Sequence, residues 1–575
     1  MWAWRRWGPL CSVSRWHRTR TEAALSNQNE QAARRLADRF WDQLLEIYPI
    51  IGTFIGDERF DDRLPDPSED GVSRREIVFR GALADLAGID RDLLDVEMRT
   101  TLSVLETGAR RELADIEYRV DRFYAVTHLF GPGTLTSTLG SNQRADTPER
   151  LEKYIRRLRA FPTFLEETSK VAMDAARAGQ VAPGLVVDRS IAQVDRLLSL
   201  APQDAPAMKP VHNASNKDKD QVASALREAV WPAYASYLET LRAYRPAARD
   251  SIGLSALPNG GETYASQILG FTSLPLEAQA VHDTGHQQLA MIQEERQTVA
   301  KQLGYEDVQS ALAEYQESGK NTAGSRQEML DLVTDQVRRS WEAAPRFFGR
   351  LPRANCQVRP IDEFQEDDMP GAYYNPPTED GSRAGTYYVN TGHLEGRPLH
   401  QTATTSFHEA NPGHHFQISI EQEFTERLPL RRFGGFLVGD AFVEGWGLYS
   451  ERLADEMGLF LNEYERLGML EAQGFRAGRL IVDTGIHALG WDREEAVQKM
   501  METGSSRLDA EIEVDRYIAM PGQALAYMIG KLELDRLRAA ATEREGSAFS
   551  LRDFHDRVLA FGSLPLAVLD DELNR

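Results

Sequence analysis

The sequence is poor in cysteine. Only two of its 575 residues are cysteines, Cys11 and Cys356. Two thiols can build neither a disulfide framework nor a cysteine-rich zinc site, so histidine and carboxylate side chains must hold any metal in this chain. The low cysteine content is compatible with a reducing compartment, and we expect a cytoplasmic location.

Long apolar runs and an excess of basic residues are also lacking. No stretch approaches about 18 consecutive apolar residues, which predicts no transmembrane helix. The chain has 66 basic and 88 acidic residues, a net charge of −22. Phosphate binding needs clustered Lys and Arg, so this composition argues against nucleic acid or anionic membranes as partners. Nothing in the composition predicts an oligomeric state.

Residues 1–25 differ from the remainder of the chain. Five arginines and four tryptophans occur there, and the first acidic residue is Glu22. The apolar stretch is too short and interrupted for a signal-peptide core. We interpret the segment as a disordered or targeting leader, either an organelle transit peptide or the product of an upstream start codon.

Most of the remaining sequence has the periodicity of amphipathic helices. One example is a stripe at helical spacing formed by Ala33, Leu36, Phe40, Leu44 and Leu45. Another is the segment 147–179, which predicts a helical hairpin or a helix kinked at Pro162. We predict a mostly α protein with an N-terminal helical half, 26–255, and a C-terminal catalytic half, 256–575.

A different pattern appears after residue 354. The runs "CQVRPIDEF", "GAYYNP" and "GTYYVNT" are β-like, and the last two are separated by a turn-rich stretch. We predict a small β-sheet beside the helix that carries the chemistry. Its strands could hold an extended peptide by edge pairing, with Tyr373, Tyr374 and Tyr387 as candidate substrate-binding residues; an irregular loop is the alternative.

The stretch "TTSFHEANPGHHFQISIEQEF" contains three of the twelve histidines within eight residues. Zinc prefers imidazole and carboxylate ligands with one position open. In H-E-x-x-H, two histidines on one helix face bind the ion, and the glutamate is the general base. His408 and Glu409 match the start of this motif.

The second histidine stands at i+6, His414, or at i+7, His415. On a straight helix His415 would return to the face of His408, but about 10 Å further along the axis. His414 would point to another face. Pro412 and Gly413 allow a bulge that returns an imidazole toward the first, and either histidine remains a candidate ligand. An ordinary helix end is the alternative.

A second stretch, "GDAFVEGWGLYSERLADEMG", supplies the carboxylates. Glu444 follows Glu409 by 35 residues in an apolar setting, where a carboxylate must be paired or bound to a metal. It is the natural third ligand. Glu451 lies two turns later and could support a ligand histidine.

Two further segments carry polar residues at helical spacing. Arg479, Asp483 and His487 are at i, i+4 and i+8, and His487 is a candidate for stabilising an oxyanion, although a lone helical histidine is more often structural. In "EVDRYIAMPGQALAYMIG", a tyrosine hydroxyl could donate to an oxyanion and an arginine could clamp a substrate carboxylate. The candidates there are Arg516, Tyr517 and Tyr527.

These motifs together resemble the bacterial domain-of-unknown-function family 885, from about residue 30 to the end. The resemblance rests on H-E-x-x-P-G-H-H followed by E-G-W-x-x-Y-x-E. It implies a zincin-like helical metallopeptidase fold, with two helical halves flanking a channel for short peptides. The H-E-x-G-H motif of such peptidases matches His408, Glu409 and the Gly413–His414 pair if two residues are inserted, which favours His414 as second ligand.

We therefore expect a zinc-dependent peptidase that cleaves short peptides, in which Glu409 is the general base that deprotonates water activated by one Zn²⁺ ion. A hydrolase or tailoring enzyme that acts on a non-peptide amide would use the same site. A non-catalytic peptide-binding protein on a degenerate peptidase scaffold is the third alternative, supported by the unusual histidine spacing. Iron or manganese could also occupy a site of nitrogen and oxygen ligands.

Overall fold

The computed structural model describes residues 12–361, 363, 366, 371–378, 381 and 383–575, without the side chains of residues 12–25. Residues 1–11 of the predicted leader lie outside the described residues, and residues 12–25 form the first turns of α1 (Ser12–Ile47). None of the helices in the described part is long and apolar enough to cross a membrane. The cytoplasmic location stays a prediction.

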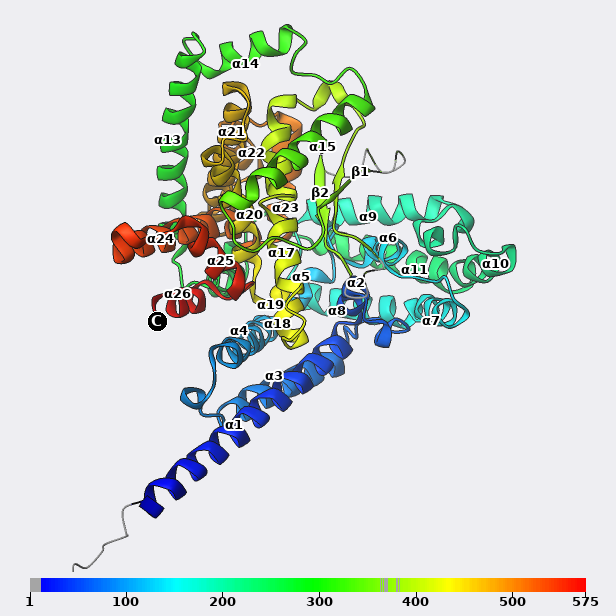
Figure 1. The fold of residues 1–575 in the computed structure, drawn as a ribbon. Helices are drawn as coiled ribbons and strands as arrows, with labels where there is room; N and C mark the ends of the chain where they lie inside the picture. Colours follow the sequence, from blue (N-terminus) through cyan, green and yellow to red (C-terminus); the bar gives the residue numbers. More distant parts are fainter. Residues whose placement is uncertain (1–11, 362, 364–365, 367–370, 379–380, 382) are drawn as a thin grey trace, which may run out of the picture.

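The described chain is mostly helical, as predicted (Figure 1). The helices before residue 255 are α1, α2 (Pro49–Ile55), α3 (Glu69–Leu86), α4 (Val96–Glu117), α5 (Asp121–Tyr124), α6 (Leu135–Asn142), α7 (Pro148–Arg159), α8 (Phe161–Ala178), α9 (Gly184–Ser199), α10 (Asn216–Ala225) and α11 (Trp231–Tyr244). The later helices are α12 (Gly260–Thr272), α13 (Ala278–Gln302), α14 (Val308–Glu317), α15 (Arg326–Ala343), α16 (Thr402–Glu409), α17 (His414–Gln422), α18 (Pro429–Phe433), α19 (Gly435–Val438), α20 (Asp440–Glu456), α21 (Glu463–His487), α22 (Arg493–Met501), α23 (Arg507–Ala519), α24 (Ala526–Glu545), α25 (Leu551–Phe561) and α26 (Leu566–Asn574).

Local sequence signals explain where several helices begin. Thr147 caps α7 by accepting the N–H of Arg150, and Pro148 occupies the first helical position. Pro162 stands in the first turn of α8, where its missing N–H costs nothing. Of the two predicted alternatives, one kinked helix and a pair of helices, the structure has a pair, α7 and α8, which meet at Ala160.

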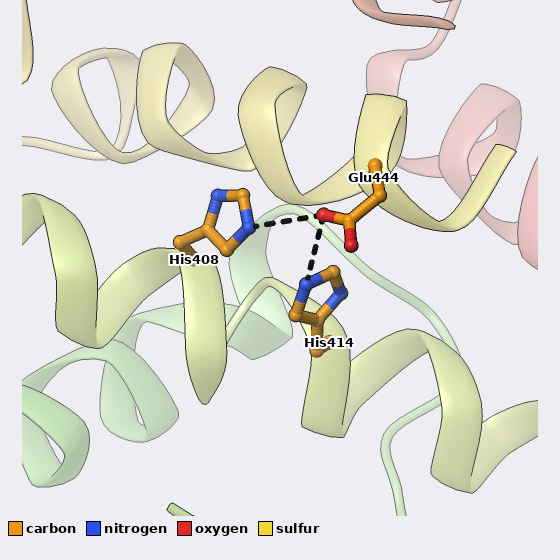
Figure 2. Close-up of side chains that lie close together, drawn as sticks. All are labelled: His408, His414 and Glu444. Atoms are coloured by element: carbon orange, nitrogen blue, oxygen red, sulfur yellow. Dashed lines mark ion pairs between the residues drawn. The ribbon is translucent and has the colours of Figure 1, made fainter. Parts of the chain in front are cut away.

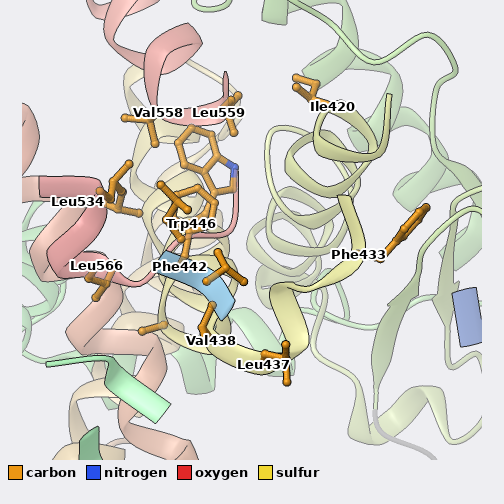
Figure 3. Packing of buried hydrophobic residues seen from close by; sticks show 14 of the residues in the cluster. Ile420, Phe433, Leu437, Val438, Phe442, Trp446, Leu534, Val558, Leu559 and Leu566 are labelled. Carbon is orange, nitrogen blue, oxygen red and sulfur yellow. The ribbon is translucent and has the colours of Figure 1, made fainter. Parts of the chain in front are cut away.

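The hydrophobic core does not divide at residue 255. Leu36 and Phe40 of α1 belong to the same buried cluster as Phe442 and Trp446 of α20. Figure 3 shows the C-terminal part of this cluster, in which side chains of α17 to α20 meet those of α24 to α26. The first helices of the chain therefore help to support α20.

The predicted small sheet is confirmed. Its strands are β1 (Gln357–Pro360), β2 (Ala372–Asn375) and β3 (Thr386–Val389), in the order β1-β3-β2. β1 runs parallel to β3, and β2 runs antiparallel to it. The sheet packs against α15 and α16.

Two of the helices that carry the motifs, α20 and α21, each pack along a second helix. α13 and α21 lie side by side, as do α20 and α24 (Figure 1). α20 also contacts α16, α17 and α21. It therefore lies among the elements that carry the predicted ligands.

Candidate metal centre

A sharp break separates the two histidine-bearing helices. α16 ends at Glu409 and α17 begins at His414, with a cis peptide bond between Asn411 and Pro412. A Cβ on Gly413 would lie 1.9 Å from the carbonyl oxygen of His408, so this position accepts only glycine. The chain folds back on itself here, and the second helix starts beside the end of the first.

The break brings His408 and His414 to one point together with Glu444 of α20 (Figure 2). Glu444 Oε2 lies 3.5 Å from His408 Nε2 and 3.4 Å from His414 Nε2. The three ligand atoms all lie within 4.8 Å of one another. Glu444 Oε2 is buried and has no hydrogen-bond partner among the described residues.

These three side chains fit a zinc ion. Tetrahedral bonds of about 2.0–2.1 Å place neighbouring ligand atoms about 3.3–3.4 Å apart, close to the 3.4 and 3.5 Å that separate the carboxylate from the imidazoles. Two imidazoles and one carboxylate form a zinc ligand set that leaves a fourth position open.

A buried carboxylate orients the first imidazole. His408 Nδ1 donates to Glu451 Oε1 at 2.8 Å, and Gln473 Nε2 donates to Glu451 Oε2 at 3.2 Å. Nε2 is thus turned toward Glu444. Burial disfavours the imidazolium, but Glu444 and Glu451 outweigh it and raise the pKa of His408 to about 9. The surroundings of His408 therefore stabilise a positive charge.

The residues around Glu444 allow the close packing of this centre. A Cβ on Gly447 would lie 2.7 Å from the His408 ring, and one on Gly445 would lie 2.4 Å from the backbone of Gly530. Trp446 Nε1 donates to the carbonyl oxygen of Pro412 at 2.8 Å. The E-G-W-G segment thus supplies the carboxylate of the cluster, space for an imidazole and a hydrogen bond to the helix break.

Glu409, the predicted base, is half-buried at the end of α16. No hydrogen bond or ion pair of its carboxylate occurs within the described parts of the chain. Burial and, to a smaller extent, the Glu409 charge raise the pKa of Tyr387, whose hydroxyl lies 3.5 Å from Ser406 Oγ. The Glu409 charge also contributes to the raised pKa of His408, so it acts on both the sheet and the cluster.

His415 points away from the other two histidines. Its Nε2 contacts the carbonyl oxygen of Ala354 at 2.9 Å, and its Nδ1 contacts the Tyr374 hydroxyl at 3.0 Å. Burial lowers its pKa to about 4. Of the two alternatives for the second ligand, the structure brings His414 into the cluster and uses His415 to join α17 to the sheet.

The candidate substrate tyrosines lie on both faces of the sheet. Tyr374 pairs with Tyr387 across β2 and β3, on the face that meets α16 and α17. Tyr373 pairs with Tyr388, and their rings stack with centroids 5.0 Å apart. Tyr387 is buried, so any contact with a substrate falls to the partly exposed Tyr373 and Tyr374.

His487 is not among the side chains of the cluster. It is fully buried; its Nε2 donates to the carbonyl oxygen of Tyr517 at 3.0 Å, and its Nδ1 accepts the N–H of Leu254 at 3.2 Å. Burial lowers its pKa to about 3. With both ring nitrogens bonded to the main chain, His487 has no donor left for an oxyanion and serves to hold α21 and α23 together.

The other predicted polar residues form one network. Arg479 Nε donates to the Tyr517 hydroxyl at 3.2 Å, and Arg479 Nη2 lies 3.1 Å from Glu513 Oε2. Arg516 Nη2 donates to the Tyr527 hydroxyl at 3.3 Å. The structure therefore joins Tyr517, Tyr527 and Arg516 through residues of α21 and α23.

Sequence reasoning missed the supporting residues Gln473, Glu513 and Trp446. Gln473 and Glu513 stand within ordinary helical patterns and gave no local signal, because their partners come from other helices. From the sequence, Trp446 could be predicted only as an apolar neighbour of Glu444. Its donor role depends on where Pro412 lies.

Comparison with known proteins agrees with this fold. The crystal structure of "the putative lipoprotein from Colwellia psychrerythraea" has a TM-score of 0.89 at 25% identity, and the match covers 95% of this chain and 98% of that chain. "A putative lipoprotein of unknown function from Shewanella oneidensis" has a TM-score of 0.76 at 18% identity, covering 94% and 100%. The search of curated proteins found no match.

A family model gives the decisive match. Residues 49–573 match the model described as "Bacterial protein of unknown function (DUF885)". The matched range includes every ligand of the candidate centre and every helix from α2 to α25. The chain therefore belongs to the bacterial protein family DUF885.

Proposed function

We propose that this protein is a zinc-dependent hydrolase that cleaves short peptides, with a zincin-like arrangement of two helical halves around the site. The convergence of His408, His414 and Glu444 at 3.4 and 3.5 Å, with Glu451 behind His408, carries the proposal. Such a carboxylate behind a ligand histidine is a usual companion of zinc sites.

The three ligands would hold one Zn²⁺ ion. When bound, the ion supplies Lewis acidity, which makes water a better nucleophile and polarises a carbonyl group. Glu409 accepts the proton of the attacking water and returns it to the leaving amine. Its lack of a partner among the described residues suits this role, because its oxygens are free to bind water.

The neighbouring sheet supports a peptide as the substrate. β2 pairs with β3 on one side only within the described part of the chain. An extended peptide could add to the free side through main-chain hydrogen bonds. Tyr373 and Tyr374 of β2 would then contact its side chains.

The test is the Glu409→Gln variant, assayed for metal content and for hydrolysis of short peptides. We expect the variant to retain zinc and to lose turnover about a hundred- to ten-thousand-fold. Glu395→Gln, at a side chain that is 81% exposed, is the matched control and should keep full activity. His408→Ala should lose the metal.

Other outcomes would select the alternatives. A wild-type protein that hydrolyses non-peptide amides and no peptide would be a hydrolase of the second class. A zinc-free protein that binds peptides without cleaving them would be a binding protein. An unchanged rate in Glu409→Gln would refute the assignment of the base.

A further inference from the structure

Three arginines gather around Glu513, and one of them also interacts with Glu451, the carboxylate behind His408. Arg476 and Arg479 are on α21, and Arg516 is on α23. All three interact electrostatically with the carboxylate of Glu513, the acidic residue between them. We refer to Arg476, Arg479 and Arg516 as the arginine cluster.

Arg479 is held rigidly but has a donor to spare. Its guanidinium lies over the ring of Tyr527 at 4.3 Å and over that of Phe475 at 4.8 Å. Its Nε and Nη2 are bonded to Tyr517 and Glu513. The side chain is only 5% exposed, and its Nη1 has no hydrogen-bond partner among the described residues. A buried donor of this kind is costly unless something binds it.

The other two arginines add a second buried donor and a side chain that solvent can reach. Arg476 Nε is also buried without a hydrogen-bond partner in the described segments. The Arg516 side chain is 27% exposed, and its Nη2 donates to Gln523 Oε1 at 2.6 Å. The cluster can therefore be reached from solvent through Arg516.

The carboxylates around the cluster are already engaged by other groups. Three guanidinium groups face the carboxylate of Glu513, and two of them also interact with other carboxylates, Arg476 with Glu451 and Arg516 with Asp483. Asp483 already accepts hydrogen bonds from the Tyr264 hydroxyl and the Gly522 N–H. Glu451 is already bonded to His408 and Gln473. The buried donors Arg479 Nη1 and Arg476 Nε, which have no hydrogen-bond partner among the described residues, therefore remain to bind an anion, and solvent screening is weak in such a partly buried setting.

The cluster lies next to the residues that support the metal ligands. Gln473, one helical turn before Arg476, donates to the same Glu451 that orients His408. Gly530, one turn after Tyr527, packs against Gly445, the neighbour of Glu444. Arg476 and Arg479 therefore share α21 with Gln473, and Arg516 bonds to Tyr527 of α24, the helix that packs against Gly445.

We propose that the arginine cluster binds the free α-carboxylate of a peptide substrate, so that cleavage occurs near the carboxyl end of the peptide. This inference rests on the proposed peptidase function. In the reaction the water oxygen bonds to the carbonyl carbon, the C–N bond breaks, and Glu409 transfers the proton to the leaving amine. The cluster holds the leaving fragment by its carboxylate, for which planar guanidinium groups are well shaped.

The experiment compares three peptides: N-acetyl-trialanine with a free carboxylate, the same peptide as its carboxamide, and an N-acetylated carboxamide with glutamate as its last residue. Affinities are measured by calorimetry on the zinc-loaded Glu409→Gln protein, where turnover does not interfere. Hydrolysis by the wild-type protein is followed in parallel. We expect the free acid to bind about ten- to a hundred-fold more tightly than its carboxamide.

Arg516→Gln should remove most of this preference. Arg452→Gln is the matched control: its side chain is 25% exposed and pairs with Glu295, away from the cluster, so the preference should persist. The fold should tolerate replacement of the partly exposed Arg516 better than replacement of the buried Arg479.

Equal affinity for the acid and its carboxamide, or no binding of either, would overturn the inference. Tight binding of the glutamate carboxamide would also overturn it, because the cluster would then recognise a side-chain carboxylate. Cleavage of acid and carboxamide at equal rates would leave the peptidase proposal intact while refuting this one. A preference for the acid in a protein that cleaves no peptide would refute the peptidase activity alone.

Discussion

Two Pro-Gly dipeptides interrupt helices near the candidate site, and they act differently. Pro412 and Gly413 separate α16 from α17, and Pro521 and Gly522 stand between α23 and α24. In both places proline removes a backbone donor and discourages helix before it. The two glycines, however, are required for different reasons.

Gly413 is required by a close contact. Its φ of −81° is open to any residue, but an added Cβ would meet the carbonyl oxygens of His408 at 1.9 Å and Phe407 at 2.4 Å. Gly522 is required by its conformation: its φ is +84°, and the nearest atoms to an added Cβ lie 3.2 Å away. Its N–H donates to the buried carboxylate of Asp483 at 3.0 Å.

The difference teaches what each break does. The first folds the chain tightly enough to bring two imidazoles together. The second turns the chain between the two helices that carry Tyr517 and Tyr527, anchored by a carboxylate from α21. The Pro-Gly dipeptide predicts a helix interruption in both places. What each interruption does depends on the elements that pack around it.

Gly413→Ala should have the largest effect, because the methyl group would push the break open and separate His414 from His408. We expect loss of zinc binding and destabilisation on the order of 3 kcal/mol, measured by elemental analysis and urea unfolding. Gly261→Ala, where nothing lies within 4 Å of the added Cβ in α12, is the control and should keep the metal. Normal zinc content in Gly413→Ala would contradict the steric account.

Asp483→Asn should change the pH dependence of stability. Burial raises the pKa of Asp483 from 3.8 to about 7, against the opposing effect of the Tyr264 and Gly522 hydrogen bonds. Between these values the folded protein keeps a proton that the unfolded chain releases. The stability from this group is therefore fully present below the unfolded pKa and is lost as the pH rises through 7.

The asparagine variant lacks that titration. Its free energy of unfolding relative to the wild type should increase by about 1 kcal/mol per pH unit between pH 4 and 7. Denaturant unfolding of both proteins at several pH values measures the difference between their free energies of unfolding. Taking the difference cancels the contributions of the other titrating groups, which the two proteins share. A difference that does not vary with pH would contradict the raised pKa at this anchor.

Gly522→Ala should have the smallest effect. The left-handed conformation costs an alanine about 1–2 kcal/mol, which urea unfolding would detect, while zinc content stays at the wild-type level. Gly522→Asn should be milder, since asparagine adopts this region more readily. Loss of metal in Gly522→Ala would show that the two breaks are coupled.

Two buried histidines show what a residue pattern can and cannot predict about a site. His408 and His487 both lie near the ends of helices, and both were candidates for the site. Carboxylates surround His408 and raise its pKa to about 9, whereas main-chain groups occupy both nitrogens of His487, and burial lowers its pKa to about 3. Helical spacing could not distinguish them, because their neighbours come from other elements.

The sequence by itself determined the helical class, the small sheet, the break after Glu409 and the residue types available for a metal. These depend on local periodicity, capping and backbone freedom, which a sequence records directly. The tertiary structure alone decided that His414 meets His408 while His415 turns to the sheet, that Gln473 supports Glu451 behind His408, and that three arginines meet around Glu513. This convergence depends on how α16, α17, α20 and α21 pack against one another. That packing cannot be predicted from the spacing of the residues along the chain.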